Sequence, residues 1–315
     1  MPQPAQLGFG MAAVGRPAYI TTGRDADLPA GRTPAALEAR AHELLDAAAA
    51  AGIGYVDAAR SYGRAEEFLA SWLRRSGAAP FVASKWGYRY TGDWRLDAEQ
   101  HEVKEHTLAA FARQWAESRA LLGPWLRLYQ VHSLTVDSPL WTDRDLLRAL
   151  AEVRAEGTEL GLSTSGPAQA DAVRRGLALT VDGRPLFTSV QSTWNPLEPS
   201  AGEALAEAHA AGARVVVKEA LANGRLAAAD SPATARLGEA ARARGVAVDV
   251  LALAVALAQP WAGVVLSGAV TVAQLQAGVA AVAVAADLDG TDAADLVTPE
   301  PAEAYWAARS SRPWR

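Results

Sequence analysis

Short apolar segments alternate with longer segments rich in alanine, leucine, arginine and glutamate along the whole chain. The short segments lack a strict apolar-polar alternation, which is typical of parallel strands that are buried on both faces. The pattern predicts eight strands, at Leu7–Met11, Tyr55–Asp57, Phe81–Lys85, Leu126–His132, Glu159–Ser163, Ser189–Ser192, Arg214–Glu219 and Val264–Leu266.

The longer segments predict helices between these strands. They lie at Thr33–Ala51, Ala65–Arg75, Lys104–Leu122, Asp143–Glu156, Pro167–Arg175, Ala201–Ala211, Ala233–Arg244 and Thr271–Ala285, with a further helix at Asp249–Ala258 before the last strand. A glycine follows six of these helical runs, where a left-handed residue ends a helix well: Gly52, Gly77, Gly157, Gly176, Gly212 and Gly245. Thr33 and Pro34 have the pattern of an N-cap followed by proline at the first helical position.

Eight strands that are each followed by a helix favour a closed parallel (β/α)8 barrel, of the TIM-barrel type, over an open doubly wound sheet. The 315 residues are compatible with one such domain. We expect the barrel proper to span about residues 7–285. The segment from Gly87 to Val103 is a longer loop rich in tryptophan and tyrosine. Residues 286–315 form a tail without strand character that packs beside the barrel mouth or trails off.

Composition narrows the possible functions. The chain has no cysteine, which excludes disulfides, thiolate zinc sites and a thiol nucleophile and fits a reducing compartment. Its net charge is −5, and no run of Lys and Arg offers a nucleic-acid footprint. The first six residues lack the pattern of a signal peptide, and the apolar stretch Val246–Leu266 is broken by polar residues and a proline. We expect a cytoplasmic protein without a membrane span.

Polar groups stand at the carboxyl ends of the predicted strands, where barrels carry their chemistry. The second, third and fourth strands offer Asp57 with Tyr62 just beyond it, then Lys85 and then His132. The later strands end in Ser163, Gln191, Lys218 and Ser267. An acid, a phenol, an ammonium and an imidazole on three successive strands are less easily explained by chance than any one of them.

The four residues Asp57, Tyr62, Lys85 and His132, here called the tetrad, suit carbonyl reduction. Hydride addition to a carbonyl leaves an alkoxide that needs a proton, but a tyrosine with a pKa near ~10 is a poor donor at neutral pH. An adjacent ammonium lowers that pKa, so Lys85 can activate Tyr62 while Asp57 positions Lys85. His132 can orient the carbonyl oxygen. Taken singly, each residue has an ordinary structural explanation, as an ion pair, a packing tyrosine or a core histidine; the combination favours the site.

At these residues the sequence resembles the aldo/keto reductase superfamily. Gly54-Tyr-Val-Asp57-Ala-Ala-Arg-Ser-Tyr62-Gly63 is similar to the signature F-D-T-A-x-x-Y-G, and Ser84-Lys85 is similar to the S/T-K strand end. Four later segments also resemble family motifs. Leu128-Tyr-Gln-Val-His132 is similar to the motif D-L-Y-x-x-H, and Gly161-Leu-Ser163 is similar to G-V-S-N. Val190-Gln191-Ser-Thr-Trp-Asn195-Pro-Leu is similar to x-Q-x-x-x-N-P-L, and the segment Gly268–Leu275 is similar to P-G-x-x-x-x-x-Q/R-L. They follow the family order from about residue 7 to residue 285.

The resemblance implies a barrel that binds NADPH across its mouth and reduces an aldehyde or ketone. It implies Tyr62 as general acid, Asp57 and Lys85 as its tuners, and His132 as the residue that orients the carbonyl. The implied cofactor-binding residues are Ser163, Thr164, Gln191, Lys218, Ser267, Gly268 and Gln274, with Ser163 and Gln191 on the nicotinamide carboxamide. Trp86 and Trp194 are candidates for the substrate pocket, or they merely cover the barrel rim.

Three departures from the family pattern concern the cofactor. Thr164 stands where the family has Asn, and Lys218 stands where an aromatic ring stacks on the nicotinamide. The last loop lacks the Arg or Lys that grips the adenosine 2′-phosphate. NADPH remains the expected cofactor and NADH is possible, with weak binding and little preference between them.

Two local motifs are misleading. Gly8-x-Gly10-x-x-Ala13 matches a dinucleotide fingerprint, but glycines and prolines surround it where a helix is required. We therefore interpret the glycines as residues that let the first strand and its loop approach a ligand closely. His101 and His106 are five residues apart, which is wrong for a helical metal site, so we expect a solvated helix start and no metal.

Two rival functions remain open at this point. One is a nicotinamide-binding, redox-sensing subunit with little turnover. The other is a non-redox barrel enzyme, a lyase or isomerase, that uses Lys85; a Schiff base needs a neutral lysine, and Asp57 favours a charged one.

Overall fold

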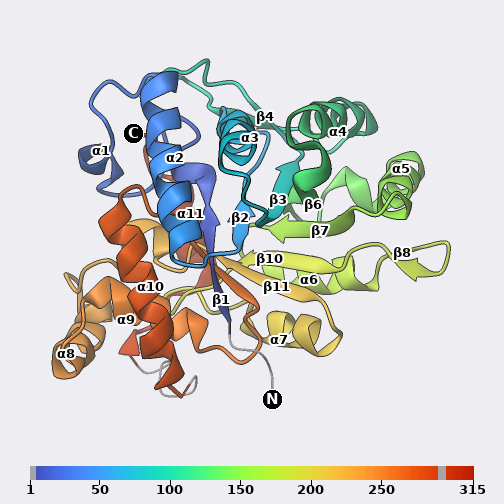
Figure 1. The fold of residues 1–315 in the computed structure, drawn as a ribbon. Helices are drawn as coiled ribbons and strands as arrows, with labels where there is room; N and C mark the ends of the chain where they lie inside the picture. The colour runs from blue at the N-terminus through green and yellow to red at the C-terminus, as the bar shows by residue number, and fades with distance from the viewer. Residues whose placement is uncertain (1–4, 290–295) are drawn as a thin grey trace.

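The computed structural model describes residues 5–289 and 296–315, and eight parallel strands close into a barrel (Figure 1). The strands are β1 (Gln6–Gly10), β2 (Tyr55–Asp57), β3 (Phe81–Trp86), β6 (Leu126–Leu134), β7 (Glu159–Thr164), β10 (Ser189–Thr193), β11 (Arg214–Lys218) and β12 (Val264–Ser267). Each pairs with its neighbours in parallel, and β12 returns to β1. The predicted (β/α)8 barrel is confirmed, and the open sheet is excluded.

Helices surround the barrel, as the sequence pattern indicates (Figure 1). They are α1 (Arg24–Asp27), α2 (Pro34–Ala50), α3 (Ala65–Ser76), α4 (Leu108–Leu122), α5 (Arg144–Ala155), α6 (Gln169–Ala178), α7 (Gly202–Ala210), α8 (Ala235–Arg244), α9 (Val248–Leu257), α10 (Val272–Ala286) and α11 (Ala302–Ser310). The Thr33 side chain accepts a hydrogen bond from the Ala36 N–H at 3.2 Å, and Pro34 opens α2 as expected.

Five of the six predicted stop glycines have positive φ angles, but Gly176 does not. Gly176 lies inside α6, and a Cβ at this position would collide with the Leu162 side chain on β7. Its prediction as a helix stop is therefore wrong: the missing side chain lets the helix approach the barrel closely.

The barrel interior has an apolar floor and a polar layer above it. The floor contains Tyr55, Ala83, Leu128, Val216 and Val264, all buried. A Cβ on Gly8 would lie 2.8 Å from Val264 Cγ1, so β1 contributes no side chain there. Because inward-facing residues alternate along a strand, the residues two positions further on, at the carboxyl ends, share this interior at the barrel mouth.

Two hairpins depart from the predicted elements. Strand β4 (Tyr88–Tyr90) pairs antiparallel with β5 (Glu102–Lys104), where the sequence suggests a loop and then a helix from Lys104. Helix α4 begins only at Leu108, because the Thr107 side chain caps it by accepting from the Ala110 N–H at 3.2 Å. A second hairpin, β8 (Thr180–Val181) with β9 (Arg184–Pro185), lies between α6 and β10.

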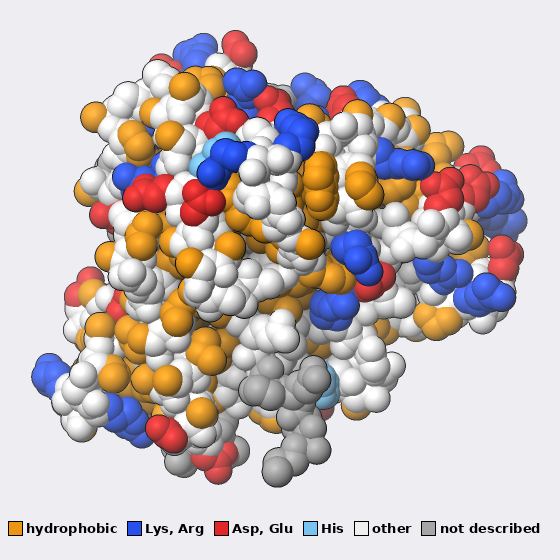
Figure 2. Space-filling view, in the orientation of Figure 1, with side chains coloured by type: hydrophobic (Ala, Val, Ile, Leu, Met, Phe, Trp, Pro, Cys, Tyr) orange, Lys and Arg blue, Asp and Glu red, His pale blue; other side chains and the backbone are white. Residues whose placement is uncertain are grey.

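The C-terminal tail contains α11 and then crosses the barrel mouth. The backbones of Tyr19 and Arg315 exchange two hydrogen bonds of 3.0 Å, which places the chain end near the loop after β1 (Figure 1). No helix within the described residues is long and apolar enough to span a bilayer. On the face shown in Figure 2, acidic and basic side chains are interspersed instead of forming a patch of one sign.

Candidate active site

The strand ends bring the predicted tetrad together. Asp57 ends β2, and Lys85 and His132 lie on β3 and β6. Tyr62 follows β2 in a loop that touches the loop after β1, and Gly15 and Gly63 make this contact possible. Gly63 has a φ of 60°, and a Cβ there would lie 2.6 Å from the Gly15 carbonyl oxygen, too close for any other residue. The Arg64 N–H donates to the same carbonyl at 2.8 Å.

Lys85 is the hub of the tetrad. Its ammonium is fully buried and donates to Asp57 Oδ2, to the Ala58 carbonyl at 3.0 Å and to Tyr62 Oη at 3.2 Å. The other carboxylate oxygen of Asp57 accepts from Gln191 Nε2 at 3.0 Å and from Gln130 Nε2 at 3.3 Å. Asp57 therefore ties together four strands of the barrel, β2, β3, β6 and β10.

His132 completes the group. Its ring lies edge-on to the Tyr62 ring with the centroids 5.4 Å apart, and its Nδ1 is 3.3 Å from Ser61 Oγ. Its backbone carbonyl accepts from His106 Nε2 at 2.9 Å. Burial and the nearby Lys85 and Arg16 charges hold the pKa of His132 well below its usual range, so the ring is neutral.

Charges of both signs act on the phenol of Tyr62. Burial raises the pKa of Tyr62 well above its usual value, and the Asp57 charge raises it further, while Arg16 lowers it. Burial also lowers the pKa of Lys85, against the Asp57 charge that raises it. The expectation that Lys85 lowers the pKa of Tyr62 stays a prediction, and the charge of Asp57, which pairs with Lys85 in the same buried layer, opposes it.

The tetrad faces a cavity of about 390 Å³ in the barrel mouth. Asp57, Tyr62 and His132 line it, whereas Lys85 lies behind them without exposed surface. Such a volume is within the usual range of small-molecule sites.

Five of the seven predicted cofactor-binding residues also line this cavity: Gln191, Lys218, Ser267, Gly268 and Gln274. Ser163 and Thr164 do not. Ser163 is in register with Gln191 and faces the interior, where its Oγ accepts from the Ser133 N–H at 2.8 Å. Thr164 points to the opposite face by strand alternation, and its Oγ1 lies 2.7 Å from Ser192 Oγ. Ser165 lines the cavity, and the cofactor-binding role of Ser163 and Thr164 stays a prediction.

Neither tryptophan that was a candidate for the substrate pocket lines the cavity. Trp86 is fully buried and packs on Phe111, with ring centroids 4.9 Å apart, under α4. Trp194 packs edge-on against Trp261 at 5.4 Å, beside α7. The contacts of both rings favour the alternative in which these tryptophans pack at the barrel rim.

The sequence analysis missed aromatic and charged residues of the cavity wall. Arg16 and Tyr19, from the loop after β1, line it together with Glu102 from β5 and with Arg309 and Trp314 from the tail. The sequence did contain a signal for Arg16, because it is a single arginine within a stretch of small residues directly after the first strand. No local pattern marks the others, because the tail reaches the cavity only by folding back.

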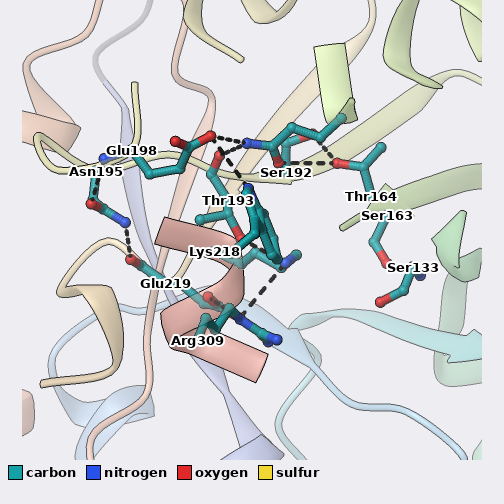
Figure 3. A network of polar contacts seen from close by, with 12 residues as sticks. Ser133, Ser163, Thr164, Ser192, Thr193, Asn195, Glu198, Lys218, Glu219 and Arg309 are labelled. Carbon is teal, nitrogen blue, oxygen red and sulfur yellow. Dashed lines mark hydrogen bonds and ion pairs between the residues drawn. The ribbon is translucent and has the colours of Figure 1, made fainter. Parts of the chain in front are cut away.

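A network of largely buried charges holds the C-terminal tail against the barrel mouth (Figure 3). Arg309 contacts both carboxylate oxygens of Glu219, with Nε to Oε2 at 2.8 Å and Nη2 to Oε1 at 2.5 Å. Lys218 Nζ donates to Thr193 Oγ1 at 2.7 Å and lies 3.7 Å from Glu219 Oε1. Arg309 and Lys218 lower the pKa of Glu219 to about 2, and burial lowers that of Lys218 to about 8.

The two misleading motifs have structural explanations. After β1 the chain forms a short 3-10 turn at Met11–Ala13, so no helix opens behind the glycines and the dinucleotide fingerprint is excluded. His101 is buried and stacks on Trp314 at 4.5 Å, and His106 is buried beneath His132. The expected solvated helix start is wrong here. Within residues 5–289 and 296–315, no cluster of three or more His, Asp or Glu side chains could hold a metal.

Comparisons with known proteins agree with this geometry. The profile of the Aldo/keto reductase family matches residues 7–296. No curated protein matches the sequence.

Similar solved structures include an aldo-keto reductase from Bacillus halodurans in its holo form, with 20% identity, a TM-score of 0.68 and coverage of 96% of this chain and 100% of that one. An aldo-keto reductase from Klebsiella pneumoniae in complex with NADPH has 19% identity, a TM-score of 0.67 and coverage of 96% and 98%. The glycerol dehydrogenase from Gluconobacter oxydans has 20% identity, a TM-score of 0.65 and coverage of 95% and 94%. These likenesses agree with the barrel fold, and the family match extends over nearly the whole chain. The chain is an oxidoreductase that belongs to the aldo/keto reductase family.

Proposed function

We propose that this protein reduces an aldehyde or ketone to an alcohol with a reduced nicotinamide cofactor, and that Tyr62 donates the proton. The observation that carries the proposal is the Lys85 ammonium, which contacts both Asp57 and Tyr62 Oη directly behind the cavity wall. The cofactor would supply the hydride to the carbonyl carbon. The balance is completed by one proton, which passes from Tyr62 to the carbonyl oxygen.

The chain's own residues favour this proton transfer. When Tyr62 gives up its proton, its oxygen stays within 3.2 Å of the Lys85 ammonium, which donates to the new phenolate. His132 is neutral, and in the tautomer whose Nδ1 accepts from Ser61 Oγ, its Nε2 carries a proton and can donate to the carbonyl oxygen. Both donors then converge on the oxygen that gains charge in the transition state.

The cavity wall suits a nicotinamide cofactor. The buried Oε1 of Gln191 has no hydrogen-bond partner within the described part of the chain, and an amide N–H such as that of a carboxamide would satisfy it. Ser267 and Gly268 at the end of β12 and Gln274 in the first turn of α10 extend the wall. The Klebsiella relative binds NADPH, and NADPH is our choice here, with NADH as a possible alternative.

The two rival functions have less support. Lys85 has no exposed surface and three hydrogen-bond acceptors, so a carbonyl in the cavity does not reach its nitrogen to form a Schiff base. A redox-sensing subunit with little turnover has no need for Tyr62 and His132 on a cavity wall with the Lys85–Asp57 pair behind Tyr62.

The test is absorbance of the reduced cofactor in mixtures of purified protein, NADPH or NADH, and a panel of aldehydes and ketones. Tyr62→Phe removes only the hydroxyl and should lower turnover by at least ~10² while cofactor binding survives. Tyr129→Phe is the matched control, because Tyr129 is another buried phenol that does not line the cavity. Near-normal turnover of Tyr62→Phe would refute the mechanism, and cofactor binding without turnover of any carbonyl would favour the sensing subunit.

A further inference from the structure

We propose that Arg16 is a positioning residue that stabilises the ionised form of Tyr62, and so adds to the positive charge of Lys85, which Asp57 partly offsets. The inference rests on the proposed role of Tyr62 as proton donor. It concerns a residue outside the tetrad, on the loop between β1 and α1.

The placement of Arg16 is unusual for an arginine. It is 2% exposed, and its guanidinium lies 5.1 Å from the centre of the Tyr62 ring. It also lies 4.8 Å from the Tyr19 ring and 4.5 Å from the Trp314 ring, so three aromatic side chains surround it. Its Nη1 donates to the Ser61 carbonyl at 2.9 Å, directly before Tyr62, and to Glu102 Oε2 at 2.8 Å. These contacts hold the cation against the phenol.

The positive charge of Lys85 at Tyr62 is partly offset. Lys85 donates to Tyr62 Oη at 3.2 Å, but it also forms a buried ion pair with Asp57, whose charge raises the pKa of the phenol. A further cation in the same low-dielectric surroundings would therefore stabilise a phenolate formed here.

Arg16 meets this requirement because its own partner is better solvated. Glu102 is 24% exposed, whereas Arg16 is almost completely buried. Water screens the carboxylate more than the guanidinium, so the pair leaves a net positive field on the side of Tyr62. Of the nearby cations, Arg16 lowers the pKa of Tyr62 most, and it also helps to keep His132 neutral.

The charges and titratable groups around Tyr62 come from every neighbouring element. They are Asp57 from β2, Lys85 from β3, His132 from β6, Arg16 and Tyr19 from the loop after β1, Glu102 from β5, and Glu219 after β11. Arg309 and Lys218 oppose the Glu219 charge. Arg16 and Glu102 are therefore the pair of charges to vary by substitution. Removing the Arg16 charge should raise the pKa of Tyr62, and removing the Glu102 charge should lower it.

The experiment measures this phenol directly in the cofactor-free protein. A fluorinated tyrosine at position 62, whose phenol is more acidic, brings ionisation into an accessible pH range, and ¹⁹F NMR reports it. In Arg16→Gln the pKa should rise by about one unit. It should stay near the parent value in Arg16→Lys and fall in Glu102→Gln. Arg174→Gln, which breaks an exposed ion pair with Glu207, is the control and should change nothing.

A merely structural role for Arg16 predicts a different result, in which Arg16→Gln and Glu102→Gln shift the pKa in the same direction or not at all. Either outcome overturns the inference. If Arg16→Gln does not fold, Glu102→Gln decides, because a pKa that fails to fall refutes the proposal. Turnover of Tyr62→Phe separates this inference from the proposed function. If Tyr62→Phe stays active, Tyr62 is not the proton donor. If Tyr62→Phe is inactive but the pKa of the phenol is unchanged in Arg16→Gln, only the role of Arg16 is refuted.

Discussion

Replacing Arg309 with methionine removes the cation that holds Glu219 in the barrel mouth. The substitution keeps an unbranched side chain and leaves a carboxylate that is 7% exposed, with Lys218 3.7 Å away and the Arg312 charge nearby. Glu219 also has a φ of 56°, so its backbone is held in a left-handed conformation by the surrounding structure. We expect this variant to be among the most destabilising substitutions in the tail.

Two arguments give the expected loss in the free energy of unfolding. A carboxyl whose pKa falls from 4.5 to about 2 on folding stabilises the protein by about 3 kcal/mol at neutral pH. Removing one partner of a buried ion pair typically costs about 3–5 kcal/mol, because the other charge stays buried. Since the folded pKa is the lower one, the contribution is present above pH 4.5 and is lost as the pH falls towards 2.

The assay is denaturant unfolding followed by the fluorescence of the ten tryptophans. Arg309→Met should lower the free energy of unfolding by about 3 kcal/mol at pH 7. The double variant Arg309→Met with Glu219→Met should recover most of the loss, because no carboxylate is left buried without its guanidinium, and Lys218 keeps its hydrogen bond to Thr193 Oγ1 at 2.7 Å. Arg174→Met is the matched control, since it breaks an exposed pair and should cost about 0–1 kcal/mol. A loss in Arg309→Met no larger than in this control would refute the reasoning.

Two further predictions concern catalysis and the cofactor. Lys85→Met removes the donor to Tyr62 and should lower the amplitude of the pH–rate profile by at least ~10²; an unchanged profile would make Lys85 a structural ion-pair member. Cofactor titration by tryptophan quenching should show weak binding with little preference for NADPH. Gln274 in the first turn of α10 donates to the Asp27 carboxylate at 2.7 Å, and this acid is unfavourable to a nearby phosphate. Submicromolar NADPH affinity with about a hundredfold preference over NADH would contradict this prediction.

The sequence determined the barrel and most of its chemistry because these depend on local patterns. Apolar segments of strand length between helical segments define parallel strands with both faces buried. Once such strands close into a barrel, their carboxyl ends converge whatever the loops do, so Asp57, Lys85 and His132 meet as predicted. The hairpin β4–β5 was missed because its strands are short and partly polar, and its antiparallel pairing joins residues about 14 apart in the chain.

Other features were decided only by the tertiary structure. The direction of each side chain at a strand end depends on register, which separates Gln191 in the cavity from Thr164 behind it. The cavity wall is completed by contacts between distant segments, as where Arg16 lies between Tyr62 and Trp314. Such contacts leave no local pattern, because loop and tail conformations are fixed by packing and buried charge pairs that form only when the chain has folded.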